Sequence, residues 1–234
     1  MLIYLLDTSG PTAGVALWQD GVIRYEAAVN NLMTHSEAAL SMTEEAYDKA
    51  GLTAADTDYF AVVAGPGSFT GVRIGVTTVK ALAKACGKPC VPVSALEAMS
   101  RSQGVFNGVI CPMQNARRGQ VYAALFNGMT GQQLMEDQPI AIGDLLTQAR
   151  EVAHGRPVLL TGDGMTAYRK ELEGLRWPEL YFADAAHAYL NPAAAAVLAS
   201  ERLDSAVDAD TLKPYYLRAP QAVRQRNLVE HAQL

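Results

Sequence analysis

Two short stretches of the sequence hold residues whose types and spacing could do chemistry. The first is Asp7-Thr8-Ser9, a carboxylate followed by two hydroxyl groups at the end of an apolar run. Carboxylate and hydroxyl oxygens can hold a magnesium-bound phosphate. The second is AGPGSFTGVRIG, residues 64–75, whose glycines permit a tight turn and whose second half reads as a helix start with amides available to an anion. Both stretches raise the question of a phosphate site.

The glycine-rich stretch fails both standard phosphate-loop templates. A Walker loop requires G-x-x-x-x-G-K-[ST], but the interval from Gly65 to Gly71 is one residue too long, and Val72 stands where the lysine belongs. The dinucleotide fingerprint G-x-G-x-x-G fails because Thr70 occupies the place of its third glycine. What remains is a strand, a turn and a helix capped by a hydroxyl group, so we favour a structural turn. A nucleotide-binding loop stays open as the alternative. The residues concerned are Asp7, Thr8, Ser9, Gly65, Gly67, Ser68 and Thr70.

Gly71 and Gly75 lie four residues apart and therefore on one face of the predicted helix. Each glycine costs about 1 kcal/mol of helix propensity relative to alanine, so a close contact should offset that cost. The contact is either with a partner protein or with the protein's own sheet, and the sequence leaves both open. The preceding helix has a similar small-residue side. The predicted partner interface consists of His35, Ala38, Ala39, Met42, Ala46, Gly71, Val72, Gly75, Val79 and Leu82.

Other catalytic and metal-binding patterns do not occur in the sequence. None of the four histidines forms a pair at helical i, i+4 spacing, and there is no H-E-x-x-H or G-x-S-x-G motif. We therefore predict no metal site, and these motifs identify no catalytic residue, although composition by itself leaves Ser-His-Asp catalysis open.

The net charge argues against a protein that binds nucleic acid directly by electrostatic attraction. The formal net charge is −5, whereas phosphate binding requires clustered lysines and arginines. Two basic exceptions are Arg117-Arg118 and the tail over residues 211–229, which holds four basic side chains and no acid. Each is either a contact for RNA or a partner, or a solvated turn or terminus.

Two series of elements are expected to position these residues. The first has strands at 2–6, 14–19, 22–29, 59–64 and 90–93 and helices at 34–50, 70–85 and 95–102. The second has strands at 105–113, 121–127, near 134 and at 158–161, with helices at 144–154 and 191–203. Strands that alternate with helices in this way predict mixed sheets covered by helices. We expect a first lobe over residues 1–103 and a second, reduced lobe with a basic tail over residues 104–234.

The bulk composition indicates an ordinary folded protein. Half of the 234 residues are hydrophobic, which is enough for a sizeable core. The apolar run at the N-terminus ends at Asp7 and is too short for a signal peptide or a membrane span, so we expect a cytoplasmic protein. The three cysteines are expected to be reduced and buried.

Taken together, six motifs strongly resemble the bacterial TsaB (YeaZ) family. They are DTS at 7–9, HSE at 35–37, GPGSFTGVRIG at 65–75, VSALE at 93–97, ARRGQVYAA at 116–124 and PYYLR at 214–218. The resemblance implies an actin-like ATPase (ASKHA, ribonuclease H-like) fold of two lobes. It also implies a role in making N6-threonylcarbamoyladenosine (t6A) in tRNA, as a binding partner of the catalytic subunit TsaD, with the ATPase TsaE joining them.

The resemblance also provides a test inside the sequence. TsaD proteins carry an H-M-E-G-H metal motif, and the comparable place here reads Ala95-Leu96-Glu97-Ala98-Met99. Both histidines are replaced, and Glu97 alone cannot hold a metal ion. This favours a subunit that is not catalytic. One departure from the family pattern is Asn115, where many relatives have an aspartate, so an ion pair expected there is lost.

Our leading hypothesis is a scaffold that packs its two predicted helices against the equivalent pair of TsaD. The resemblance implies a homodimer when TsaD is absent and contact with tRNA only through the complex. We expect no membrane association and no cofactor in isolation, and the sequence leaves open whether a nucleotide binds at the assembled interface. Three alternatives remain: an ATP-dependent enzyme of the actin-like class that uses Asp7, an M22-type metallopeptidase, and a direct tRNA binder that uses its basic tail and Arg117-Arg118.

Overall fold

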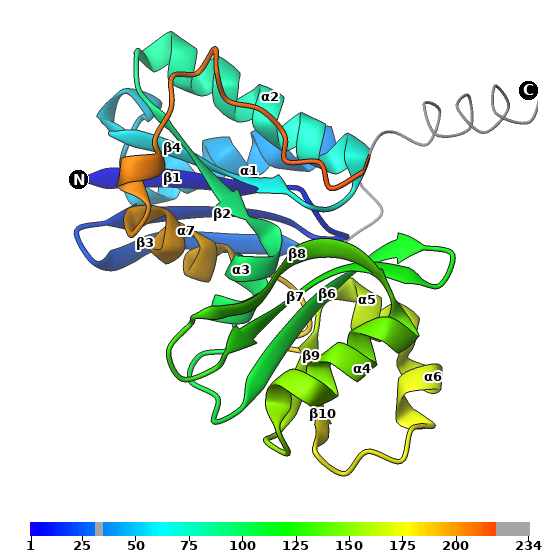
Figure 1. The fold of residues 1–234 in the computed structure, drawn as a ribbon. Coiled ribbons are helices and arrows are strands. Elements are labelled where there is room, and N and C mark those ends of the chain that lie inside the picture. The colour runs from blue at the N-terminus through cyan, green and yellow to red at the C-terminus, as the bar shows by residue number, and fades with distance from the viewer. Residues whose placement is uncertain (31–34, 219–234) are drawn as a thin grey trace, which may run out of the picture.

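The structure, a computed structural model, describes residues 1–30 and 35–218. The first lobe is built on a five-stranded sheet in the order β3-β2-β1-β4-β5 (Figure 1). Its strands are β1 (Leu2–Asp7), β2 (Ala13–Gln19), β3 (Val22–Val29), β4 (Tyr59–Gly65) and β5 (Cys90–Ser94). The first three strands form the predicted antiparallel meander, and β4 and β5 continue from β1 in parallel. Parallel neighbours require crossover connections, and helices supply them here.

Helices cover both faces of this sheet because the side chains of β1 alternate. Leu2, Tyr4 and Leu6 pack with α1 (His35–Ala50) and α2 (Phe69–Cys86), whereas Ile3 and Leu5 pack with α3 (Ala95–Arg101) and α7 (Pro192–Ser200). Successive side chains of a strand point to opposite faces, so a fully apolar strand has helices on both sides.

The second lobe repeats this strand order as β10-β9-β6-β7-β8. Its strands are β6 (Val109–Arg117), β7 (Gln120–Asn127), β8 (Gln133–Ala141), β9 (Val158–Thr161) and β10 (Leu180–Phe182). Its helices are α4 (Ile142–Ala153), α5 (Asp163–Ala167) and α6 (Arg169–Glu173). The expected loose repeat of the first lobe is therefore confirmed for the meander and the first parallel strand. Strand β10 and the short helices α5 and α6 carry too little periodicity to be read from sequence.

The chain returns to the first lobe after the second sheet is complete. Helix α7 packs on β1 and β2, and the 3₁₀ turn Leu203–Ser205 that follows it contacts β5. The chain then runs beside α2 (Figure 1), where Lys80 and Lys84 bond to Asp210. Val207 pairs with Cys90, and the amide of Tyr215 donates to the carbonyl of Ala64 at 2.7 Å. We call residues 206–218 the return segment. The sequence expectation assigned it to the second lobe, but its backbone pairs with β4 and β5 of the first, and only its end, at Arg218, reaches Tyr122 of the second.

Local signals place the helix ends. The hydroxyl of Ser68 accepts from the amide of Gly71 and so begins α2, and Gly87 ends it with φ 64°. The side chain of Asn191 accepts from the amide of Ala194 at the start of α7, followed by Pro192 at the first helical position. Among the described helices, none is both long and apolar enough to cross a membrane.

Candidate functional site

At the end of β1 the chain forms a turn in which Asp7 and Thr8 are buried and hydrogen-bonded within the protein. The carboxylate of Asp7 accepts from the amide of Ser9 at 2.8 Å, and the hydroxyl of Thr8 donates to the carbonyl of Gly71 at 2.7 Å. Asp7 is 2% exposed and Thr8 is fully buried. Burial raises the pKa of the Asp7 carboxyl, against the hydrogen bond from Ser9. Asp7 therefore forms a turn, as Asp commonly does.

The glycines of the 64–75 stretch lie against this loop. A Cβ on Gly71 would fall 2.0 Å from the carbonyl oxygen of Thr8, and one on Gly75 would fall 2.5 Å from the Thr8 hydroxyl. A Cβ on Gly67 would fall 2.2 Å from the carbonyl oxygen of Ser9, which also accepts from the amide of Ser68 at 2.8 Å. The glycines thus allow α2 to approach β1 and its loop more closely than any side chain permits. Of the two contacts that the sequence left open, Gly71 and Gly75 make the one with the protein's own sheet.

Most of the predicted partner interface lies in the core of the first lobe. Eight of the ten residues are buried, and only His35 and Leu82 are half-exposed. The buried residues are Ala38, Ala39, Met42, Ala46, Gly71, Val72, Gly75 and Val79. All but the two glycines pack in one core cluster with Tyr4 and Phe60 of the sheet, and the glycines lie against Thr8. A partner cannot contact these side chains while the lobe is folded.

The outer side of α1 and α2 presents a different set of residues. On α2 they form an uncharged stripe at spacings of three and four, which places them on one face. The stripe consists of Thr70, Ile74, Thr77, Thr78, Ala81 and Ala85, of which Ile74 and Thr78 are half-exposed and the others exposed. On α1, Leu40 is 57% exposed. We call Leu40 and the stripe the outer helix face.

The other flank of α2 is covered by the return segment. Arg73 lies 4.0 Å from the ring centroid of Phe69, and its Nε donates to the hydroxyl of Tyr216 at 2.8 Å. The ring of Tyr216 stacks on that of Phe69 with centroids 5.1 Å apart. Lys84 pairs with Asp210 at 2.8 Å. The basic residues of α2 are therefore engaged within the chain, which leaves the uncharged stripe as its outward face.

A cleft of about 660 Å³ lies between the two lobes. The first lobe contributes the loop after β1, His35 of α1, the start of α2 and the end of the return segment. The second lobe contributes the end of β6, Tyr122 of β7 and Asp163 of α5. Of the residues predicted for a nucleotide-binding loop, the cleft is lined by Ser9, Gly67, Ser68 and Thr70. Asp7 instead lines a separate cavity of about 10 Å³. The loop residues therefore come together, but their carboxylate does not face the open cleft.

The second-lobe wall of the cleft is the tip of the β6–β7 hairpin. Arg117 and Arg118 have φ of 64° and 56°, a left-handed conformation that is uncommon outside glycine. The side chain of Asn115 accepts from the amide of Arg117 at 2.8 Å, and the hydroxyl of Tyr168 accepts from the amide of Gly119 at 3.1 Å. Asn115 thus shapes the turn through an amide oxygen, without the ion pair that an aspartate would allow.

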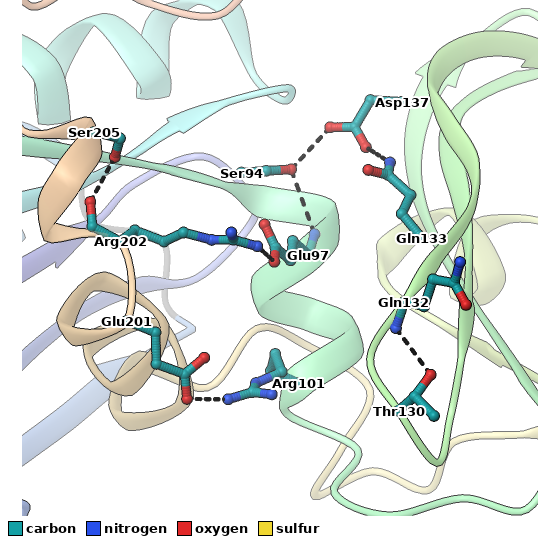
Figure 2. A network of polar contacts seen from close by, with 10 residues as sticks. All are labelled: Ser94, Glu97, Arg101, Thr130, Gln132, Gln133, Asp137, Glu201, Arg202 and Ser205. Atoms are coloured by element: carbon teal, nitrogen blue, oxygen red, sulfur yellow. Dashed lines mark hydrogen bonds and ion pairs between the residues drawn. The ribbon is translucent and has the colours of Figure 1, made fainter.

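Glu97, the residue that the resemblance compared with a metal motif, is engaged within the chain. Its carboxylate accepts from Arg202 at 2.5 Å (Figure 2). The parallel pair Arg101 and Glu201 joins the same elements. Within residues 1–30 and 35–218, no group of three or more His, Cys, Asp and Glu side chains is arranged to hold a metal ion.

A polar contact joins the lobes beside Glu97. The hydroxyl of Ser94 donates to Asp137 of β8 at 2.8 Å, and Gln133 donates to the other carboxylate oxygen at 2.9 Å (Figure 2). Burial, together with the neighbouring carboxylates of Glu97 and Glu136, raises the pKa of Asp137. Sequence reasoning did not find Asp137, because nothing in the local pattern of β8 shows that Ser94 lies opposite it.

Comparison with known proteins gives consistent matches. The sequence matches the TsaD family, described as tRNA N6-adenosine threonylcarbamoyltransferase, over residues 30–224. It is 33% identical over 224 residues to the tRNA threonylcarbamoyladenosine biosynthesis protein TsaB of Bacillus subtilis (strain 168), covering 95% of this chain and 96% of that protein. It is 40% identical over 78 residues to the tRNA N6-adenosine threonylcarbamoyltransferase of Agrobacterium fabrum, covering 33% of this chain and 21% of that protein.

The fold matches a crystal structure from Pseudomonas aeruginosa described as an uncharacterized protein with similarity to peptidase YEAZ. The TM-score is 0.77 at 22% sequence identity, covering 93% of this chain and 99% of that chain. This likeness, together with the two repeated sheets, confirms the two-lobed α/β fold class that the sequence resemblance implied.

Proposed function

Because the chain belongs to the TsaB family of tRNA threonylcarbamoyladenosine biosynthesis proteins, we propose that it is a non-catalytic subunit that binds and activates TsaD. The observation that carries the proposal is the outer helix face. Its α2 residues are uncharged, small apart from Ile74, and exposed or half-exposed. Helix α1 contributes Leu40, which lies one turn from the exposed residues Glu37 and Glu44. Helices pack through such surfaces, since small side chains let the two axes approach closely.

The pairing of Glu97 with Arg202 supports a non-catalytic role. A carboxylate that already holds a guanidinium is not available to a metal ion without loss of that ion pair. The burial of Asp7 likewise weighs against the alternative of an ATP-dependent enzyme that uses this carboxylate.

The interface is tested by matched substitutions of two exposed helical threonines. Thr77→Arg places a long cation on the outer helix face, whereas Thr147→Arg places the same cation on α4 of the second lobe. We expect Thr77→Arg to weaken binding to TsaD of the same organism at least tenfold in calorimetry, because a packed helix interface cannot accommodate the unpaired guanidinium. Thr147→Arg should bind like the wild type.

The two possible failures have different meanings. If the wild type does not bind TsaD or raise its t6A synthesis on unmodified tRNA, the proposed function is wrong. If the wild type binds and Thr77→Arg binds equally well, the function stands and the outer helix face is not the interface.

The finer features of the assembly belong to the same proposal. TsaE joins the complex, tRNA is contacted through the complex, and a nucleotide binds at the assembled interface. Without TsaD, two copies pair through the outer helix face, so Thr77→Arg should also sediment as a monomer. The protein acts in the cytoplasm.

A further inference from the structure

Beside the inner end of the cleft, the two lobes enclose a second, much smaller cavity of about 10 Å³. The first lobe lines it with the loop after β1, which includes Asp7 and Thr12. The second lobe lines it with Gln114 of β6 and Asp163 of α5. A space of this volume holds one water molecule and excludes anything larger. A single molecule placed there touches both lobes.

Gln114 brings a polar atom without a partner to this cavity. The residue is 4% exposed, and its Oε1 has no hydrogen-bond partner in the described part of the chain. A buried carbonyl oxygen of this kind has given up its bonds to solvent and gained none in return, so such atoms are rare in folded proteins. Solvent in the cleft does not reach the atom, because it is buried away from the surface. Its partner must therefore lie inside the protein.

The rest of the lining supplies the other partners that a buried water needs. Such a water makes about three hydrogen bonds. The carboxyls of Asp7 and Asp163 can accept from it, and the hydroxyl of Thr12, a residue that is 8% exposed, can donate to it. Among the described residues, no group of three or more His, Cys, Asp and Glu side chains is arranged to hold a metal ion. The lining therefore suits water rather than a cation.

We propose that one buried water molecule occupies this cavity and bridges the two lobes. It donates to Oε1 of Gln114 in the second lobe and bonds to the loop after β1 in the first. The start of α2 packs on that loop through Gly67 and Gly71. The bridge therefore ties the position of α2, and with it the outer helix face, to the second lobe. The proposal concerns the isolated chain and does not depend on TsaD.

A high-resolution crystal structure of the full chain tests the site directly. We expect one ordered water within hydrogen-bond distance of Oε1 of Gln114 and of a group in residues 7–12. The proposal is wrong if the density shows no water there. It is also wrong if the side-chain amide is rotated and bonds to protein atoms without water.

Gln114→Met tests the site in solution through the sign of the change in stability. Methionine has a similar shape and no strong acceptor at this place. With water bound, the variant removes one of its partners, so we expect the urea midpoint to fall. In a dry cavity the variant removes a buried group without a partner, so a midpoint that rises or stays unchanged would contradict the proposal. Gln120→Met, at a half-exposed place on β7 outside the cavity, is the matched control and should leave the midpoint unchanged.

Hydrogen exchange measured by NMR separates a bridge between the lobes from an effect within one lobe. The amide of Ser9 belongs to the first lobe and donates to Asp7 at 2.8 Å. We expect Gln114→Met to speed the exchange of this amide about tenfold, because the loop loses its tie to the second lobe, and Gln120→Met to leave it unchanged. If Gln114→Met speeds exchange only in β6, the water is not shared between the lobes and the bridge is refuted.

Discussion

Thr8 and the glycines of α2 set the geometry of the first lobe at the scale of single residues. The carbonyl oxygen of Thr8 lies where Gly71 would carry a Cβ, and its hydroxyl donates to the carbonyl of the same glycine. The helix therefore sits directly on the end of β1. The glycines lower the helix propensity of α2, and the close contact with β1 offsets that loss.

Gly71→Ala tests this contact. The new Cβ would meet backbone 2.0 Å away, so we expect a loss of about 2 kcal/mol or more in the free energy of unfolding, because overpacking outweighs the propensity gain. Gly143→Ala is the matched control, since Gly143 also lies in a helix and has no atom within 4 Å of the added Cβ. It should raise the stability by up to about 1 kcal/mol. Urea unfolding of both variants gives the comparison, and equal effects would contradict the close-contact account.

The return segment packs mainly with the first lobe, although it follows the second lobe in the sequence. Leu212 is 2% exposed within the core cluster that holds Tyr4 and Phe60, far away in sequence. Val207 and Tyr215 add backbone bonds to β5 and β4. The core of the first lobe therefore includes residues that follow the second lobe in the sequence.

Leu212→Ala is expected to cost about 2–5 kcal/mol, because it leaves a cavity in the core of the first lobe. Leu175→Ala removes the same atoms from a side chain that is 41% exposed in the second lobe, and we expect a change within about 0.5 kcal/mol. Urea unfolding measures both. A small effect at Leu212 would mean that the return segment is peripheral to the first lobe.

At the scale of the whole molecule, the lobes are joined by apolar and polar contacts. Ala124 and Phe126 of β7 share a core cluster with α3 and α7 of the first lobe. Beside this cluster, the carboxyl of Asp137 accepts from Ser94 across the lobes. A carboxyl in this place is disfavoured in its charged form by burial and by two neighbouring acids.

Asp137 predicts a pH dependence of stability. Its pKa in the folded protein is raised above 3.8, so the carboxyl favours folding most at low pH, and this contribution is lost as the pH rises through the folded value. We therefore expect Asp137→Asn to gain stability relative to the wild type between pH 4 and pH 7. Asp56→Asn is the opposite control, because hydrogen bonds from Thr53 lower the pKa of Asp56 and its contribution is lost as the pH falls. Urea unfolding at pH 4 and pH 7 gives the free energy of unfolding of each variant relative to the wild type. If this difference is the same at both pH values for Asp137→Asn, the raised pKa of Asp137 is not the cause.

Local patterns in the sequence were sufficient for the main elements and for the family. The apolar run of β1, the alternation of β3, the cap at Ser68 and the Asn191-Pro192 helix start depend on neighbouring residues, so they could be read in order. The glycine spacing also showed correctly that α2 makes a close contact. It did not show with what, because a helical face has the same pattern whether it meets a partner or the protein's own strand.

The tertiary structure decided which surfaces are available. Eight of the ten predicted interface residues are buried in the core, and Asp7 does not line the cleft. Arg218 lies 5.7 Å from the ring centroid of Tyr122, although the two residues are far apart in the sequence. These outcomes depend on contacts between residues far apart in sequence, which no local pattern encodes. The sequence alone thus determined the elements and the family, and the packing of the two lobes decided that the candidate sites are the outer helix face and the cleft between the lobes.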